Sequence, residues 1–161
     1  MKKLYVVGNK ASKSLSPTIF NYWFKKYNIK ASYGYLELTE KNFHKKINEV
    51  LKRKDTLGLN VTIPFKNKII KHLGKIDAHA KKIGAVNCVT NKKTINGTNT
   101  DWTGYYKTLP NIKKTKNRKV IILGYGGASH AIHYVLKKRG FKDILIFNRS
   151  KKKIKYSKNT E

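Results

Sequence analysis

The chain has 161 residues, 39% of them hydrophobic, so its length suits one medium domain or two small ones with enough apolar material for a core. Its 37 lysines and arginines outnumber 8 acidic residues and give a formal net charge of +29, yet only four of these basic residues are arginines. Proteins that read base edges rely on bidentate arginine, and here lysines are spread over every segment, so we interpret the charge as coding bias and expect no specific nucleic-acid partner.

Cysteine content and apolar run lengths indicate the compartment. Cys88 is the only cysteine, which excludes an internal disulfide and a cysteine-based metal site and favours a reducing compartment. The apolar run that begins at Leu4 breaks at Gly8, too early for a signal peptide, and no stretch reaches membrane-spanning length. We therefore expect a cytoplasmic protein with no metal and no membrane partner.

The first part of the chain alternates between strand and helix patterns. Apolar runs predict three strands, at residues 4–7, 31–38 and 57–61. A helix between the first two is expected to begin with Ser16 as N-cap and Pro17 at the first helical position, and its broad apolar face is expected to be core. A second helix follows a predicted Thr39 cap. This β-α-β-α-β order implies a mostly parallel sheet covered by helices, with ligands at the carboxyl ends of the strands.

The end of the third predicted strand combines polar residues with a lysine. Asn60 and Thr62 interrupt a β-branched apolar run, Pro64 ends regular pairing, and Lys66 follows two residues later. A lysine held beside a pocket can transfer protons near neutral pH because desolvation disfavours its charged form. In so basic a chain a single lysine is more often a solvated surface charge, so the pattern alone leaves both interpretations open.

Beyond Lys66 the sequence predicts a short basic helix, a second helix that begins at Asp77, and a hairpin whose turn is formed by residues 91–93. Asp101 then lies among small polar residues and is one of the few acidic residues in the chain. Its most common role would be the N-cap of a helix over residues 102–109, and this role is compatible with one in catalysis.

Residues 110–119 are polar and lysine-rich, and we interpret them as the link to a second unit. An apolar strand at 120–123 runs into a glycine-rich stretch, followed by a helical pattern to Arg139 and a strand at 144–147. Such a turn lets backbone N–H groups approach a pyrophosphate at the helix N-terminus, although a tight turn alone would also need glycine. The residues expected at this cofactor site are Gly124, Gly126, Gly127 and Ala128.

The end of the last predicted strand indicates which dinucleotide is bound. NAD-binding units usually carry an acidic residue about 20 residues past the glycines, where it binds the ribose 2′-hydroxyl. This chain has Asn148, Arg149 and Ser150 there, with Lys153 close behind. Because an arginine without an acid favours a 2′-phosphate, NADP is the expected cofactor and these four residues are expected to contact it.

Six motifs together resemble those of the shikimate dehydrogenase family, in the same order and with similar spacing. They are SLSP at 14–17, NVTIPFK at 60–66, GAVN at 84–87, NTDWTG at 99–104, GYGGA at 124–128 and NRS at 148–150. The resemblance covers essentially the whole chain. It implies an α/β fold with a substrate-binding domain built on a mostly parallel sheet, residues 1–103, and a Rossmann-type NADP-binding domain, residues 104–161. Family members run further, so it also implies that the second domain is truncated.

The family reduces 3-dehydroshikimate to shikimate with NADPH in aromatic amino-acid (chorismate) biosynthesis, and the resemblance implies roles for single residues. Lys66 and Asp101 look like the catalytic pair, with the lysine transferring a proton at the oxygen of the carbon that exchanges hydride. Ser14 and Ser16 would bind the substrate carboxylate, and the others its ring hydroxyls. The implied substrate contacts are Ser14, Ser16, Asn60, Thr62, Lys66, Asn87, Thr100 and Asp101.

Two alternatives to an NADP-dependent shikimate dehydrogenase stay open at this point. One is a quinate- or shikimate-linked dehydrogenase that uses NAD. The other is a non-catalytic remnant that binds shikimate-like ligands, or only polyanions through its charge. The sequence also leaves open whether a homodimer, a separate fragment or nothing completes the cofactor site.

Overall fold

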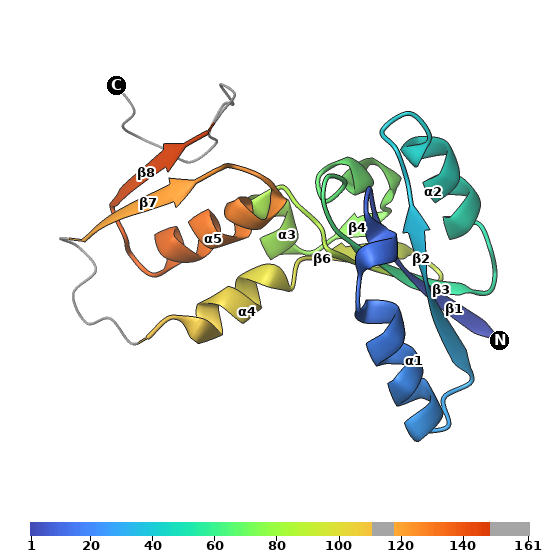
Figure 1. The fold of residues 1–161 in the computed structure, drawn as a ribbon. Coiled ribbons are helices and arrows are strands. Elements are labelled where there is room, and N and C mark those ends of the chain that lie inside the picture. The colour runs from blue at the N-terminus through green and yellow to red at the C-terminus, as the bar shows by residue number, and fades with distance from the viewer. Residues whose placement is uncertain (111–117, 149–161) are drawn as a thin grey trace. The chain divides into compact units, whose positions relative to one another are not determined.

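Six strands form one sheet in the first of two units into which the chain divides, Met1–Thr100 and Asp101–Glu161. The structure is a computed structural model, and it describes residues 1–110 and 118–148 (Figure 1). The strands of the first unit are β1 Lys2–Gly8, β2 Ala31–Glu37, β3 Thr56–Val61, β4 Lys75–Ile76, β5 Cys88–Asn91 and β6 Ile95–Thr98. Its helices are α1 Ser16–Lys26, α2 Phe43–Leu51 and α3 Ala78–Ile83, with short 3₁₀ turns η1 Ala11–Lys13 and η2 Lys68–His72.

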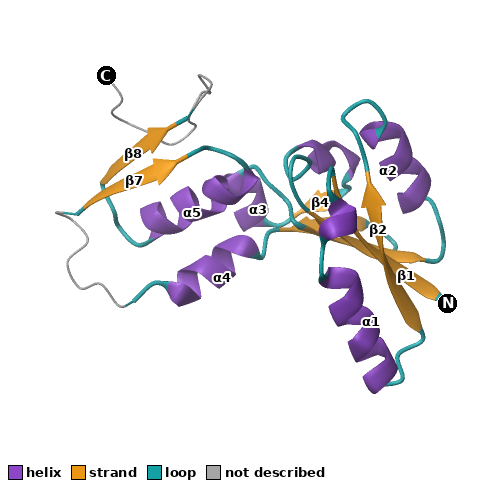
Figure 2. Cartoon of the chain, in the orientation of Figure 1, coloured by secondary structure: helices purple, strands orange, loops and turns teal. Residues whose placement is uncertain are grey.

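The sheet has the strand order β2-β1-β3-β5-β6-β4. Figure 2 shows its strands in orange and the helices in purple. Strand β1 pairs in parallel with both β2 and β3, and β4 pairs in parallel with β6, whereas β5 is antiparallel to both of its neighbours. The predicted α/β fold with a mostly parallel sheet is therefore confirmed. The hairpin is also confirmed, since Asn91 pairs with Ile95 across the predicted turn. The helix predicted at Asp77 is α3, in which the N–H groups of His79 and Ala80 donate to the Asp77 carboxylate.

Helices α1 and α2 pack on opposite faces of this sheet. Alternate residues of a strand point to opposite faces, and in β1 Val7 belongs to the cluster under α2 while Val6 belongs to the cluster under α1. On the α2 side, Phe43 stacks on Phe65 with ring centroids 4.2 Å apart, and both side chains are fully buried. The buried residues of α2 recur at helical spacing, as the sequence pattern predicts; they are Phe43, Ile47, Val50 and Leu51. The predicted Thr39 cap is wrong, because the N-cap residue of α2 is Asn42; Thr39 lies three residues earlier and exchanges hydrogen bonds with Asn42.

The prediction that the apolar face of α1 is core is wrong. No residue of α1 is buried, and Ile19, Trp23 and Tyr27 keep 44%, 45% and 63% of their surface exposed. Phe20 and Phe24 pack on the sheet, because the helix covers its edge at β2 and β1. In the part of the chain that the structure describes, no other element of the first unit buries the remaining apolar side chains of this helix.

The start of α1 also differs from the prediction. Ser16 is the first helical residue, and no side chain caps the helix from the residue before it. The hydroxyl oxygen of Ser14 instead accepts a hydrogen bond from the Ser16 N–H at 3.2 Å. A free N–H of the first turn is thus satisfied from two residues upstream, which leaves the Ser16 side chain available for another contact.

The second unit contains α4 Asp101–Thr108, β7 Lys119–Leu123, α5 Gly127–Lys138 and β8 Asp143–Phe147, so the predicted strand–helix–strand order is confirmed. Strands β7 and β8 are parallel and in register, over a small core whose buried members are Ile122, Leu136, Phe141 and Ile144. Asp101 is the first residue of α4 and not its N-cap, so its carboxylate lies in the first turn, where the helix dipole favours it. Among the described residues, no helix is both long and apolar enough to cross a membrane.

We expect Gly58→Ala to destabilise the first unit by about 1–3 kcal/mol, because a Cβ there would lie 2.4 Å from the carbonyl oxygen of Val89 in the neighbouring strand. Urea unfolding followed by circular dichroism would measure the shift in midpoint. Gly104→Ala is the matched control, since a Cβ on Gly104 meets nothing within 4 Å and alanine favours the interior of a helix by roughly 0.5–1 kcal/mol. A wild-type midpoint for Gly58→Ala would contradict the tight β3–β5 approach.

Candidate active site

Several strand ends of the first sheet meet at a single edge. Because β1 and β3 are parallel and β5 is antiparallel to β3 and β6, the carboxyl ends of β1, β3 and β6 lie beside the amino end of β5. In the register, Val7 pairs with Val61, Asn60 with Cys88, and Cys88 with Thr98. The substrate contacts implied by the sequence that lie on or just beyond these ends are Ser14, Ser16, Asn60, Thr62, Lys66, Asn87 and Thr100.

The backbone of Lys66 is fixed on both sides. After β3 ends, the Thr62 N–H donates to the Val7 carbonyl at 2.8 Å and the Phe65 N–H to the Thr62 carbonyl at 2.9 Å. The Lys66 carbonyl in turn accepts the Val86 N–H at 2.7 Å, and the ring of Phe65 is fully buried. Lys66 itself is half-buried. These contacts place the lysine at the strand end that the sequence predicts, with its Cα held by its neighbours.

Asn87 and Thr100 hold each other at the same edge. The Asn87 amide nitrogen donates to the Thr100 hydroxyl at 2.9 Å, and its amide oxygen accepts the Thr100 backbone N–H at 2.8 Å. The backbone of Asn87 is tied to both flanking strands, because its carbonyl accepts the Val61 N–H and its N–H donates to the Thr98 carbonyl. Both ends of the amide are therefore oriented before any ligand arrives.

A carboxylate at the end of β2 anchors the segment between β1 and α1 that carries Ser12, Ser14 and Ser16, which we call the serine loop. Both the N–H and the hydroxyl of Ser12 donate to the carboxylate of Glu37, and these two bonds, the side-chain one first, hold the pKa of Glu37 below its usual range. Two residues later Ser14 accepts the Ser16 N–H. A hydroxyl that accepts a hydrogen bond keeps its own proton, so Ser14 remains able to donate to an anionic group. Glu37 was not predicted from the sequence, although an acid at a strand end is rare in this chain.

Tyr33 is a second residue that was not predicted from the sequence. Its hydroxyl donates to the amide oxygen of Asn60 at 2.6 Å, although the ring is almost fully buried. The available signal was a tyrosine in the middle of a predicted strand, because a buried tyrosine hydroxyl usually has a hydrogen-bond partner. The partner itself lies on another strand and could not be identified from the sequence.

The glycine-rich turn joins β7 to α5 as predicted. Gly124 has a φ of 88°, which favours glycine, and its N–H donates to the Phe147 carbonyl at 2.7 Å. Tyr125 is buried, and its N–H donates to the amide oxygen of Asn148 at 3.1 Å. The Asn148 amide oxygen therefore helps to fix the turn.

The turn fits a pyrophosphate. Gly126 is the N-cap residue of α5, and a Cβ placed on it would meet nothing within 4 Å, so the space beside this helix N-terminus is open. Gly127 and Ala128 form the first turn of α5, where N–H groups lack intrahelical partners. The other predicted cofactor residues, Arg149, Ser150 and Lys153, lie outside the described residues.

Asp101 begins α4 in the second unit and is half-buried. Its proposed partner Lys66 belongs to the first unit. Across residues 1–110 and 118–148, no three or more histidine, cysteine, aspartate or glutamate side chains form a group that could hold a metal ion.

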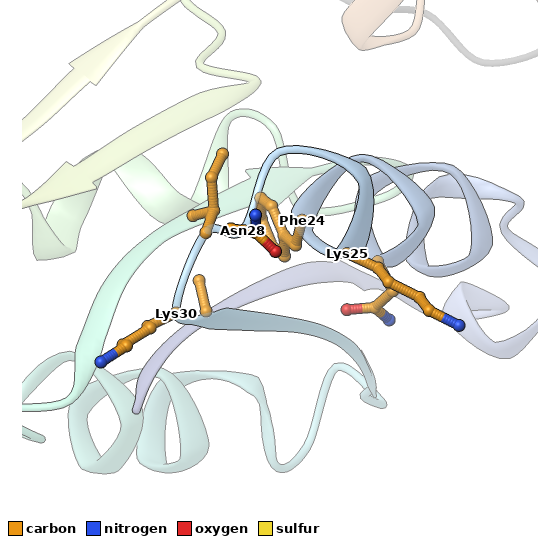
Figure 3. Close-up of a pocket in the computed structure, with 7 residues that line it drawn as sticks. Phe24, Lys25, Asn28 and Lys30 are labelled. Atoms are coloured by element: carbon orange, nitrogen blue, oxygen red, sulfur yellow. The ribbon is translucent and has the colours of Figure 1, made fainter.

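A pocket of about 460 Å³ lies at the opposite end of β2 from this edge (Figure 3). Residues of the last turns of α1 and of the connection to β2 line it, including Asn21, Phe24, Lys25 and Lys30. None of the predicted site residues borders this pocket. It is therefore separate from the candidate site.

Comparison with known proteins identifies the family. The family model described as the shikimate dehydrogenase substrate binding domain matches residues 6–89. A shikimate dehydrogenase (NADP(+)) of Aquifex aeolicus is 40% identical over 151 residues, which are 92% of this chain and 55% of the relative. Among solved structures, shikimate dehydrogenase 1 of Peptoclostridium difficile has a TM-score of 0.84 at 32% identity, in a match that covers 96% of this chain and 58% of that one.

A shikimate 5-dehydrogenase of Thermus thermophilus, solved in complex with NADP(H) and shikimate, has a TM-score of 0.76 at 27% identity, in a match that covers 93% of this chain and 57% of that one. The chain thus spans about half the length of the curated relatives it matches. The match of the family model extends over just over half of the chain and takes in the ends of β1 and β3, where the serine loop and Lys66 lie. The chain belongs to the shikimate dehydrogenase family.

Proposed function

We propose that this protein is an NADP-dependent shikimate dehydrogenase, which interconverts 3-dehydroshikimate and shikimate in aromatic amino-acid biosynthesis. The observation that carries the proposal is the sheet edge where polar side chains from four strand ends lie together with the anchored Lys66. The unit Met1–Thr100 would be the substrate domain and the unit from Asp101 the NADP-binding domain, with the boundary between residues 100 and 104. The single cysteine and the short apolar runs favour a cytoplasmic location.

In the proposed mechanism the chain binds and orients the substrate and moves one proton. NADPH, when bound at the glycine-rich turn, supplies the hydride. The ammonium group of Lys66 donates a proton to the oxygen that becomes the hydroxyl, and in the reverse direction its amine takes that proton back. The Ser14 hydroxyl donates its proton in a hydrogen bond to the substrate carboxylate. The Asn87 amide is already oriented by Thr100, so binding the ring hydroxyls costs no further conformational entropy of this side chain.

Binding and turnover together test the proposal. We expect the chain to bind shikimate in isothermal titration calorimetry, and oxidation of shikimate to be faster with NADP than with NAD when NADPH absorbance is followed. Quinate serves as the control substrate. Equal rates with NAD would favour the quinate- or shikimate-linked alternative, binding without turnover would favour the non-catalytic remnant, and absence of shikimate binding would reject the proposal.

We expect Lys66→Ala to lower kcat by about 10²–10⁴-fold while the Kd for shikimate changes little, because loss of a proton donor mainly affects the transition state. Steady-state kinetics on a form of the protein that shows turnover would measure kcat, and calorimetry would measure Kd. Lys68→Ala removes the same charge from a surface lysine that pairs with Glu40 at 2.9 Å, and it should leave both values unchanged. Near-normal kcat in Lys66→Ala would remove Lys66 from the mechanism.

We expect Asp101→Asn to weaken shikimate binding by at least about tenfold and also to slow turnover, since the carboxylate would accept hydrogen bonds from substrate hydroxyls as well as orient the lysine. Calorimetry and kinetics would separate these two losses. If Asp101 only interacted favourably with the dipole of α4, the substitution would lower stability by about 0.3–1 kcal/mol and leave the Kd unchanged. An unchanged Kd with a lower unfolding midpoint would therefore support that purely structural role.

A further inference from the structure

The hydroxyl of Tyr33 reaches across a strand to a residue of the candidate site. Tyr33 lies in β2 and Asn60 in β3, and β1 lies between these strands in the sheet. Both side chains lie on the α1 face, because Tyr33 packs with Val6, the β1 residue that pairs with Asn60. The hydroxyl donates to the Asn60 amide oxygen at 2.6 Å, which is a short hydrogen bond for a neutral pair.

The ring that carries this hydroxyl is fixed in place. It stacks face to face on Phe20 of α1, with ring centroids 4.6 Å apart and planes 8° from parallel. The backbone of the same residue is held by Asn21, whose amide donates to the Tyr33 carbonyl and accepts the Tyr33 N–H, both at 2.8 Å. Only 3% of the Tyr33 surface is exposed. The hydroxyl therefore has a defined position at the edge of the site.

The hydroxyl also keeps its proton. Burial, with a smaller contribution from Cys88, raises the pKa of Tyr33 to about 12, although the nearby Ser16 side chain acts to lower it. The hydroxyl is therefore neutral over the whole physiological pH range, and its single proton is available for Asn60.

The direction matters because an asparagine amide has two different ends. If the amide oxygen of Asn60 faces Tyr33, its NH₂ group must point away from Tyr33, and the amide nitrogen offers donors to an acceptor at the sheet edge. Without the tyrosine proton the amide could turn over and present its oxygen instead. A substrate hydroxyl that accepts from Asn60 would then lose its donor.

We propose that Tyr33 is a positioning residue: it fixes the Asn60 amide as a donor to a ring hydroxyl of the substrate. The inference rests on the proposed function of this site. It differs from a structural role, in which a buried tyrosine merely satisfies its hydroxyl and affects stability but not binding.

Tyr33→Phe tests the inference because phenylalanine keeps the stack on Phe20 and removes only the hydroxyl. We expect the Kd for shikimate, measured by calorimetry on the folded variant, to rise about three- to tenfold. In an Asn60→Ala background the same substitution should change Kd by less than about twofold, because its effect passes through Asn60. Tyr35→Phe, in the same strand but with the side chain 53% exposed, is the matched control and should bind as wild type.

Asn60→Asp gives a second measurement that does not depend on the folding of Tyr33→Phe. It keeps an acceptor for the Tyr33 hydroxyl and replaces the amide donor, so its Kd should rise at least as much as that of Asn60→Ala. Unchanged binding in Asn60→Asp, or equal effects of Tyr33→Phe with and without Asn60, would overturn the proposal. If wild type binds no shikimate, the proposed function fails; if wild type binds and Tyr33→Phe binds equally well, only the positioning role fails.

Discussion

Strand β3 is the element on which the rest of the first unit depends. It pairs in parallel with β1 on one side and antiparallel with β5 on the other, so its carboxyl end meets the end of one strand and the start of another. The close approach on the β5 side is possible only because Gly58 lacks a side chain. Once this pairing exists, the serine loop, the Lys66 turn and the Asn87–Thr100 pair must share one edge.

Acidic residues are so few in this chain that their positions carry information. Glu37 holds the Ser12 turn, and Asp77 caps α3. Others pair with lysines on the surface, as Asp55 does with Lys3 at 2.9 Å. The pKa of Glu37 is lowered in the fold by its two hydrogen bonds from Ser12. These bonds therefore contribute to folding stability at every pH above the ordinary range of a carboxylate. This stability is lost as the pH falls through the lowered pKa of Glu37. The surface ion pairs contribute little to stability.

Sequence periodicity predicted the elements better than their surroundings. Most of the strands, the buried face of α2 and the Asp77 cap follow from local patterns, which depend on neighbours in the chain, whereas the two-residue strand β4 was not predicted. The exposure of Trp23 does not, because spacing indicates which side chains share a helix face and not how much of that face another element covers. The link between Tyr33 and Asn60 crosses an intervening strand, so no local pattern contains it. Motif spacing predicted which residues gather at the edge, and the structure added what orients them.

Anchoring and chemistry alternate along the segment that follows Leu59. Val61 and Phe65 are buried in the core under α2, while Asn60 and Lys66 remain half-buried at the edge. Each group that would meet substrate is thus one residue away from a group that holds the sheet together. A rate lost on substituting Phe65 would therefore carry no information about the mechanism, because the same change displaces Lys66. Only substitutions that keep the buried neighbours intact can separate the chemistry of this edge from the packing that creates it.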